Sequence, residues 1–328
     1  MPIAEFLPIR ACLFDMDGLL LDTEDIASQC HSLVLAKYGR PPLPPHIKAQ
    51  MMGRNGVTAR KILLDWAGLT LTDEEYRTEV SKFQKELFPA AKPLPGVEDL
   101  LNKIDGTKFG DQPVHLALAS SCSTSTFTAK TSKLQEMFTV FSEDRRILGD
   151  SPLVPKGRGK PFGDIYEIAL KSINDSLSPD EKPITPAECL VFEDSVSGVE
   201  AGRRAGMRVI WCPLQCLADA YAGQEPEVLA GLTGGATIDM HQCGEVGDGW
   251  GEQIANLVDF PLEKYGIVVS QAEVKGSRQV NAYKEVNELK QLNGLKEVNS
   301  YKEVIVCGCK EINGCGGING CKPILSCA

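Results

Sequence analysis

The chain has 328 residues, a formal net charge of -10 and a hydrophobic fraction of 43%. These values predict one or two globular domains and disfavour nucleic acid as a partner, because an acidic surface repels polyphosphate. No apolar run is long enough to cross a bilayer and no secretory leader is recognisable, so we expect a soluble, cytoplasmic protein with no membrane partner. The sequence gives no indication of the oligomeric state.

Four short apolar runs are predicted to be buried strands, because each stops abruptly at a polar residue or a proline. They cover residues 8–14, 114–119, 188–192 and 207–212. Amphipathic, helix-like stretches lie between them, at residues 96–104, 164–173 and 197–205. This alternation predicts an α/β fold with a Rossmann-like parallel sheet. Polar residues at the carboxyl ends of the strands would then face one ligand crevice.

The segment between the first two predicted strands is far longer than an ordinary crossover connection. Helical patterns fill residues 25–88, and three prolines between positions 89 and 95 mark the return to the sheet. We therefore predict an inserted α-helical cap at residues 25–89. The catalytic core would comprise residues 1–24 and 90–265.

Residues 266–328 differ in character from the rest of the chain and are predicted to be a low-complexity, disordered tail. The tripeptide KEV recurs at positions 284, 296 and 302, and a six-residue period follows. Such a period can also arise from a tandem DNA repeat or from translated non-coding sequence. Five cysteines lie there without a CxxC pair or a histidine, which makes a zinc site a poor alternative, and a β-helix would need more repeats.

Residues 15–23 read DMDGLLLDT and follow the first predicted strand directly. Asp15 and Asp17, two positions apart, can face one cleft, where one carboxylate serves as nucleophile and the other as general acid and base. Gly18 allows a sharp turn between strand and loop. The alternative is an ordinary turn with solvated carboxylates, but the preceding buried strand favours the catalytic interpretation.

This segment resembles the first motif of the haloacid dehalogenase superfamily. The other three motifs of the superfamily also have counterparts, in the same order along the chain. Ser120 ends the second predicted strand, Lys160 lies in GKPFGD, and Glu193 with Asp194 lies in VFEDS. The resemblance extends from about residue 8 to about residue 260. By themselves, Ser120 and Lys160 would be interpreted as a helix cap and an exposed loop lysine.

The resemblance implies a role for each of these residues. Asp15 would be the nucleophile and Asp17 the general acid and base, while Ser120, Ser121 and Lys160 would bind phosphate. The implied cofactor is Mg²⁺, which binds a few carboxylate oxygens together with water and substrate phosphate. Its ligands would be the Asp15 carboxylate, the Asp17 backbone carbonyl and the Asp194 carboxylate. Glu193 would be either a direct ligand or an outer-sphere partner.

Within the superfamily, the chain is most similar to the group that includes pseudouridine-5'-phosphatase. The shared segments are FDMDGLLLDTE, MGR, LASS, CLVFEDS and GVEA. The group's KPDPDIF is replaced by KPFGDIY at residues 160–166, after a longer loop at residues 149–159. In the cap, Arg54 and Asn55 are predicted to contact the non-reacting part of the substrate, although an ordinary interhelical turn would also explain them.

Asp17 favours phosphoryl transfer, because the dehalogenases of the superfamily lack an acid at this position. We therefore expect a Mg²⁺-dependent phosphatase that acts through an aspartyl-phosphate on a small phosphorylated metabolite. The substrate would be a sugar phosphate or a nucleoside 5'-monophosphate such as pseudouridine 5'-phosphate. The alternatives are a phosphosugar mutase similar to β-phosphoglucomutase, and a non-catalytic binding protein on the same fold.

Overall fold

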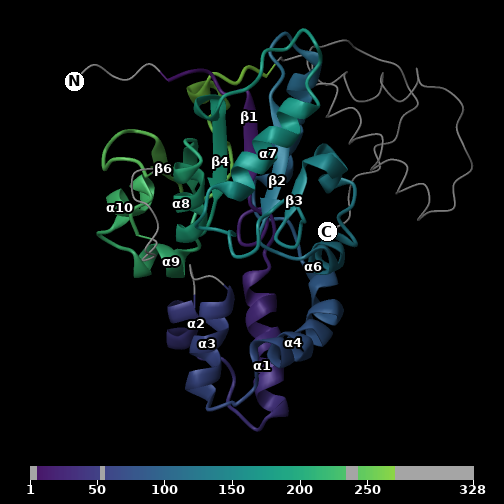
Figure 1. Cartoon of the computed structure of the whole chain (residues 1–328), viewed down its shortest axis with the longest axis vertical. Helices are drawn as coiled ribbons and strands as arrows, with labels where there is room; N and C mark the ends of the chain where they lie inside the picture. Colours follow the sequence, from purple (N-terminus) through teal and green to yellow (C-terminus); the bar gives the residue numbers. More distant parts are fainter. Residues whose placement is uncertain (1–5, 52–55, 234–242, 270–328) are drawn as a thin grey trace, which may run out of the picture. The chain divides into compact units, whose positions relative to one another are not determined.

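The computed structural model describes residues 6–51, 56–233 and 243–269 (Figure 1). Two expectations from the sequence lie outside this part of the chain. These are the low-complexity tail, apart from residues 266–269, and the substrate contacts of Arg54 and Asn55.

The core is a parallel sheet of six strands in the order β3-β2-β1-β4-β5-β6, so the predicted α/β Rossmann-like fold is confirmed. The strands are β1 (Ala11–Phe14), β2 (His115–Ser120), β3 (Arg146–Leu148), β4 (Cys189–Glu193), β5 (Arg208–Trp211) and β6 (Gly251–Gln253). The chain builds outward from β1 to β3 and then crosses back to β4. The strand order thus reverses between β1 and β4, which is where an open α/β sheet places its ligand crevice.

Helices cover both faces of this sheet. They are α5 (Val97–Gly106), α6 (Thr124–Thr131), α7 (Asp164–Asp175), α8 (Val196–Arg204), α9 (Gln215–Ala220) and α10 (Glu225–Ala230). Buried side chains of α5 and α6 belong to the apolar cluster on one face of the sheet. Those of α7 and α8 belong to the cluster on the other face. The result is a three-layer α/β/α core.

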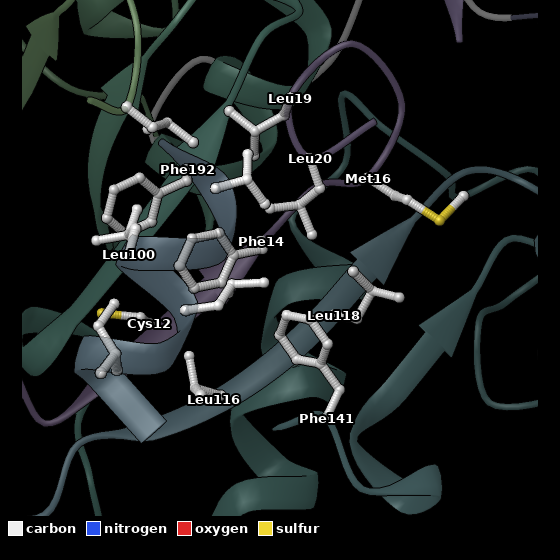
Figure 2. Packing of buried hydrophobic residues seen from close by; sticks show 14 of the residues in the cluster. Cys12, Phe14, Met16, Leu19, Leu20, Leu100, Leu116, Leu118, Phe141 and Phe192 are labelled. Carbon is white, nitrogen blue, oxygen red and sulfur yellow. The ribbon is translucent and has the colours of Figure 1, made fainter. Parts of the chain in front are cut away.

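Strand β1 is buried on both faces, and its alternate side chains enter the two clusters. Ala11 and Leu13 join one cluster, and Cys12 and Phe14 join the other, as the two-residue period of a strand requires. Figure 2 shows Phe14 beside Phe192 of β4, and the two rings stack with their centroids 4.5 Å apart. Burying each such side chain contributes about 1.5–3 kcal/mol. The chain position that follows β1 is therefore held by a rigid central strand.

Between β1 and α5, the described residues include four helices that form a group of their own in Figure 1. They are α1 (Glu24–Lys37), α2 (Pro45–Met51), α3 (Gly56–Ala67) and α4 (Asp73–Leu87). Their apolar stripes face one another and form a separate buried cluster, which includes Val34, Leu63 and Val80. A capping box between Thr72 and Glu75 starts α4. Division of the chain into separate domains at residues 24/25 and 89/90 remains a prediction.

The two crossings between the core and these helices lie side by side. Leu21, before α1, forms an antiparallel bridge with Pro93, after α4. The Asp22 N–H donates to the Lys92 carbonyl over 2.9 Å, and the Leu94 N–H donates to the Leu20 carbonyl over 3.0 Å. The chain thus leaves and re-enters the core through one short, hydrogen-bonded ladder.

His31 of α1 is expected to make the stability of the protein dependent on pH. Its Nδ1 lies 2.7 Å from the Tyr76 hydroxyl of α4. Burial, together with the charge of Arg60, lowers the pKa of His31 to about 4. The unfolded chain takes up this proton near pH 6.5, so the contribution of His31 to the free energy of unfolding should fall by about 2 kcal/mol between pH 7 and pH 5. In His31→Gln that contribution should be missing from chemical denaturation curves at the two pH values. His46→Gln is the control, because His46 is exposed, and it should leave the pH dependence of the free energy of unfolding unchanged. The same pH dependence in wild type and His31→Gln would contradict the prediction.

Candidate active site

The carboxyl ends of three neighbouring strands bring four of the predicted residues together. Asp15 follows β1, Ser120 ends β2, and Glu193 and Asp194 end and follow β4. All four are buried, as is Lys160, which reaches the same place from the loop before α7. Ser121 lines the cavity above them. The residues that the sequence places far apart therefore share one crevice, at the reversal point of the strand order.

Lys160 is the central cation of this cluster. Its Nζ donates to Asp15 Oδ1 over 2.5 Å, to Glu193 Oε1 over 2.6 Å and to the Ala119 carbonyl over 2.9 Å. Burial alone would lower the pKa of Lys160, but the carboxylates of Asp15 and Glu193 raise it above its ordinary value. The ammonium group consequently stays charged although it is buried.

Four donors surround the Glu193 carboxylate. Besides Lys160, the Tyr166 hydroxyl of α7 donates to Oε1 over 2.6 Å. The Ser195 N–H and hydroxyl donate to Oε2 over 3.2 and 3.1 Å. Both oxygens of Glu193 therefore accept hydrogen bonds, and one of them holds the Lys160 ammonium group. Tyr166 occupies an apolar position of its helix pattern, so its hydroxyl could not be predicted to donate to Glu193.

Oxygen atoms of Asp15, Glu193 and Asp194 lie within 4.8 Å of one another. Burial raises the pKa of Asp15 to about 7, and Lys160 opposes the rise while Glu193 and Asp17 add to it. Burial and the neighbouring carboxylates of Asp15 and Glu193 also raise the pKa of Asp194 well above its usual range. Three buried carboxylates share one buried ammonium, so the cluster lacks positive charge.

The surroundings of Asp194 fit a metal ligand. Within the described residues, no donor hydrogen-bonds to its carboxylate, in contrast to that of Glu193. A Cβ added to Gly18 would lie only 2.3 Å from Asp194 Oδ2, and the φ of Gly18 is +79°. Glycine is therefore required there for the carboxylate to stay in place. All-oxygen ligands of this kind suit a hard divalent cation.

Asp17 lies at the edge of the cluster and is more exposed. Its Oδ1 accepts hydrogen bonds from the Thr23 hydroxyl over 2.7 Å and from Lys130 Nζ over 2.6 Å. Lys130 is buried on α6, and its ammonium group lies 4.5 Å from the centre of the Phe88 ring. Sequence reasoning missed Lys130. The available signal was its spacing of three residues from Phe127, which places both on the buried face of α6.

A cavity of about 280 Å³ lies over these groups and is lined from both sides. The core contributes Asp15, Asp17, Ser120, Ser121, Lys160, Asp194, Ser195, Ser197 and Leu217. The chain from α1 to α3 contributes Glu24, Ala27, Ser28, His31, Leu43, Lys48, Met51 and Ala59. The polar side chains of α1 and α2 thus face the carboxylates across a space suited to a small polar molecule.

Gly198 of α8 leaves room for the Glu193 carboxylate. A Cβ at this position would lie 1.8 Å from Glu193 Oε1. Helix propensity alone would make Gly198→Ala stabilising by about 1 kcal/mol. We expect the opposite sign, a loss of about 1–3 kcal/mol in the free energy of unfolding, because the carboxylate must move away from its four donors. Urea denaturation measures the difference, with Gly159→Ala as control because a Cβ there meets nothing within 4 Å. Stabilisation by Gly198→Ala would contradict the prediction.

Residues 12–212 match the model of the family described as "Haloacid dehalogenase-like hydrolase". The chain belongs to the haloacid dehalogenase-like hydrolases. This membership confirms the resemblance found in the sequence. Among the helices of the described residues, none has the length and apolar character needed to span a membrane.

Relatives within this family have been named as phosphatases. The chain is 35% identical to a probable pseudouridine-5'-phosphatase of Saccharomyces cerevisiae over 79% of this chain and 98% of that protein. It is 34% identical to (DL)-glycerol-3-phosphatase 1 of Arabidopsis thaliana over 68% of this chain and 70% of that protein. The expected enzyme class, a phosphoric monoester hydrolase, agrees with these relatives.

A solved structure supports the fold. A HAD hydrolase of family IA from Entamoeba histolytica superposes with a TM-score of 0.56 at 19% identity. The match covers 78% of this chain and 97% of that protein. At this identity the likeness concerns the arrangement of the sheet and its helices alone.

Proposed function

We propose that this haloacid dehalogenase-like hydrolase is a Mg²⁺-dependent phosphatase that acts on a small phosphomonoester through an aspartyl-phosphate. The observation that carries the proposal is the buried cluster of Asp15, Asp194, Glu193 and Lys160 beside Asp17. Among the described residues, the Asp194 carboxylate has no hydrogen-bond donor, Asp15 and Glu193 are paired with Lys160, and Asp17 lies at the rim. A purely structural ion-pair network would not require carboxylates in such different surroundings.

The chemistry follows from these positions. A carboxylate oxygen of Asp15 attacks the phosphorus, and the bond from phosphorus to the leaving oxygen breaks. Asp17 gives a proton to that oxygen. Asp17 then takes a proton from a water molecule whose oxygen attacks the aspartyl-phosphate, which releases inorganic phosphate and restores the Asp15 carboxylate. Ser120 Oγ already accepts the Cys122 N–H over 3.2 Å, so its own hydroxyl hydrogen is available to a phosphoryl oxygen.

Mg²⁺ would be held by the carboxylates of Asp15 and Asp194 and, as the resemblance implies, by the Asp17 backbone carbonyl. When bound, it would offset the negative charge that the substrate and the carboxylates bring together. Glu193 would act through Lys160, since its oxygens are occupied by other donors.

Removal of one metal ligand should be visible without any substrate. Titration calorimetry with Mg²⁺ should give binding to the wild-type protein and a loss of at least about tenfold in affinity for Asp194→Asn, because one anionic oxygen ligand becomes a neutral amide. Asp175→Asn, on the outer face of α7, is the matched control. Equal affinities for Asp194→Asn and wild type would remove Asp194 from the metal site.

The substrate class is proposed to be a sugar phosphate, a polyol phosphate or a nucleoside 5'-monophosphate. The relatives' names and the cavity volume of about 280 Å³ support it. The test is inorganic phosphate release from a panel that includes pseudouridine 5'-phosphate and glycerol 3-phosphate, with Mg²⁺ and with EDTA. Metal-dependent release from one compound well above the rest is expected. No release, with isomerisation of a hexose 1-phosphate, would indicate a mutase, and no conversion at all would indicate a binding protein.

A further inference from the structure

We propose that Lys130 is a positioning residue that holds one oxygen of Asp17, so that the other oxygen carries the proton in catalysis. This inference rests on the proposed phosphatase function. It concerns a residue outside the motifs on which the family resemblance depends.

The two oxygens of Asp17 have different surroundings. Oδ1 accepts two hydrogen bonds, from Thr23 Oγ1 over 2.7 Å and from Lys130 Nζ over 2.6 Å. In the described part of the chain, no hydrogen bond to Oδ2 is formed, and Asp17 lines the cavity. The side chain of Asp17 is 26% exposed, whereas that of Lys130 is 6% exposed. The carboxyl group is thus anchored from the protein side and open on the cavity side.

Lys130, which holds Oδ1 of Asp17, is itself fixed by its surroundings. Lys130 shares the buried face of α6 with Phe127 and Thr131. Its ammonium group lies against the Phe88 ring, which supplies a cation–π contact. Ser123 starts α6 by accepting the Thr126 N–H, and the Thr124 N–H donates to Asp150, so the helix cannot rotate freely. A lysine fixed at this depth limits the carboxyl group of Asp17 to one orientation.

A stabilising ion pair alone explains these contacts less well. Burial of an ammonium group costs free energy that one pairing does not reliably return. An apolar side chain at position 130 would fill the same site beside Phe88 without that cost. The placement of both donors on one oxygen, with the other oxygen left open to the cavity, matches the needs of proton transfer. A misplacement of about 1 Å can lower the rate of such a step by about 100-fold.

The loss of proton transfer in a Lys130 variant can be distinguished from a general loss of structure by the choice of the substrate's leaving group. In the first step, Oδ2 of Asp17 gives its proton to the leaving oxygen as the phosphorus–oxygen bond breaks. An alkoxide leaving group needs this proton, whereas p-nitrophenolate leaves readily without it. The ratio kcat/KM reports events up to the release of the alcohol or phenol. It is therefore insensitive to the later hydrolysis of the aspartyl-phosphate.

The experiment compares Lys130→Met with wild type on p-nitrophenyl phosphate and on the best alkyl phosphomonoester of the panel. We expect kcat/KM to fall by at least about tenfold for the alkyl substrate and by less than about threefold for p-nitrophenyl phosphate. Lys171→Met is the matched control, because the Lys171 side chain is 71% exposed on α7. It should leave both values unchanged.

Thr23→Val provides a second variant in case Lys130→Met does not fold. It removes the other donor to Oδ1, and Thr23 makes no side-chain capping bond to α1 that would be lost with it. The same preference for the aryl substrate is expected. Equal losses on both substrates, or no loss, would overturn the positioning role. A wild-type protein that cleaves neither substrate would instead overturn the proposed function and, with it, this inference.

Discussion

Replacement of Asp15 by asparagine should reduce phosphate release by at least about 10³-fold, because a neutral amide cannot form the aspartyl-phosphate. The fold should survive. Burial raises the pKa of the Asp15 carboxyl group to about 7, so a neutral side chain suits this position in the metal-free protein. The measurement is kcat on the best substrate of the panel at saturating Mg²⁺, together with thermal unfolding in EDTA.

The control for Asp15→Asn is Asp175→Asn, which makes the same chemical change on an exposed side chain of α7. It should retain wild-type kcat. Full activity of Asp15→Asn would rule out covalent catalysis by this residue. An activity loss that is accompanied by unfolding would show instead that the carboxyl group is needed for structure.

Replacement of Lys160 by methionine should affect both stability and catalysis. The variant leaves fully buried Glu193 without its cation, and breaking a buried pair in this way costs about 3–5 kcal/mol. It also removes the ammonium group beside the nucleophile, so we expect kcat to fall by at least about 10²-fold. Urea denaturation at pH 7 in EDTA measures the first effect, and phosphate release measures the second.

Two comparisons sharpen the Lys160 prediction. Lys171→Met, the exposed control, should change neither quantity. The double variant Lys160→Met with Glu193→Gln should recover part of the lost stability, because the unpaired charge is gone, but none of the lost activity. A Lys160→Met protein as stable as wild type would show that Glu193 is not held by this pairing.

Sequence reasoning found the carboxylates because sheet geometry is regular. Asp15 and Asp194 directly follow strands that alternate with helices, and the ends of parallel strands meet at one edge. Strands β3 and β6 escaped prediction because three residues carry too little apolar pattern. Helix α6 was not predicted, because its serines and threonines are poor helix formers. Only the structure identifies Ser123 as its N-cap.

Donors from helices were harder to foresee than acids at strand ends. Tyr166 and Lys130 reach the site only through the way α7 and α6 dock on the sheet, and docking depends on the whole apolar surface. Lys160 was identified through the family resemblance, because a loop lysine has no positional signal of its own. The roles of Arg54 and Asn55 stay predictions.

The bridge between Leu21 and Pro93 has a consequence for the evolution of this chain. Where the two ends of an insertion are hydrogen-bonded neighbours, the intervening segment can be lengthened, shortened or recombined without a shift in the strands on either side. Selection can therefore change the helices that line one side of the cavity while the carboxylates at the strand ends are inherited intact. If the proposed phosphatase function holds, a chimera that joins a relative's four helices at this ladder should still release phosphate and acquire the donor's preference among phosphate esters.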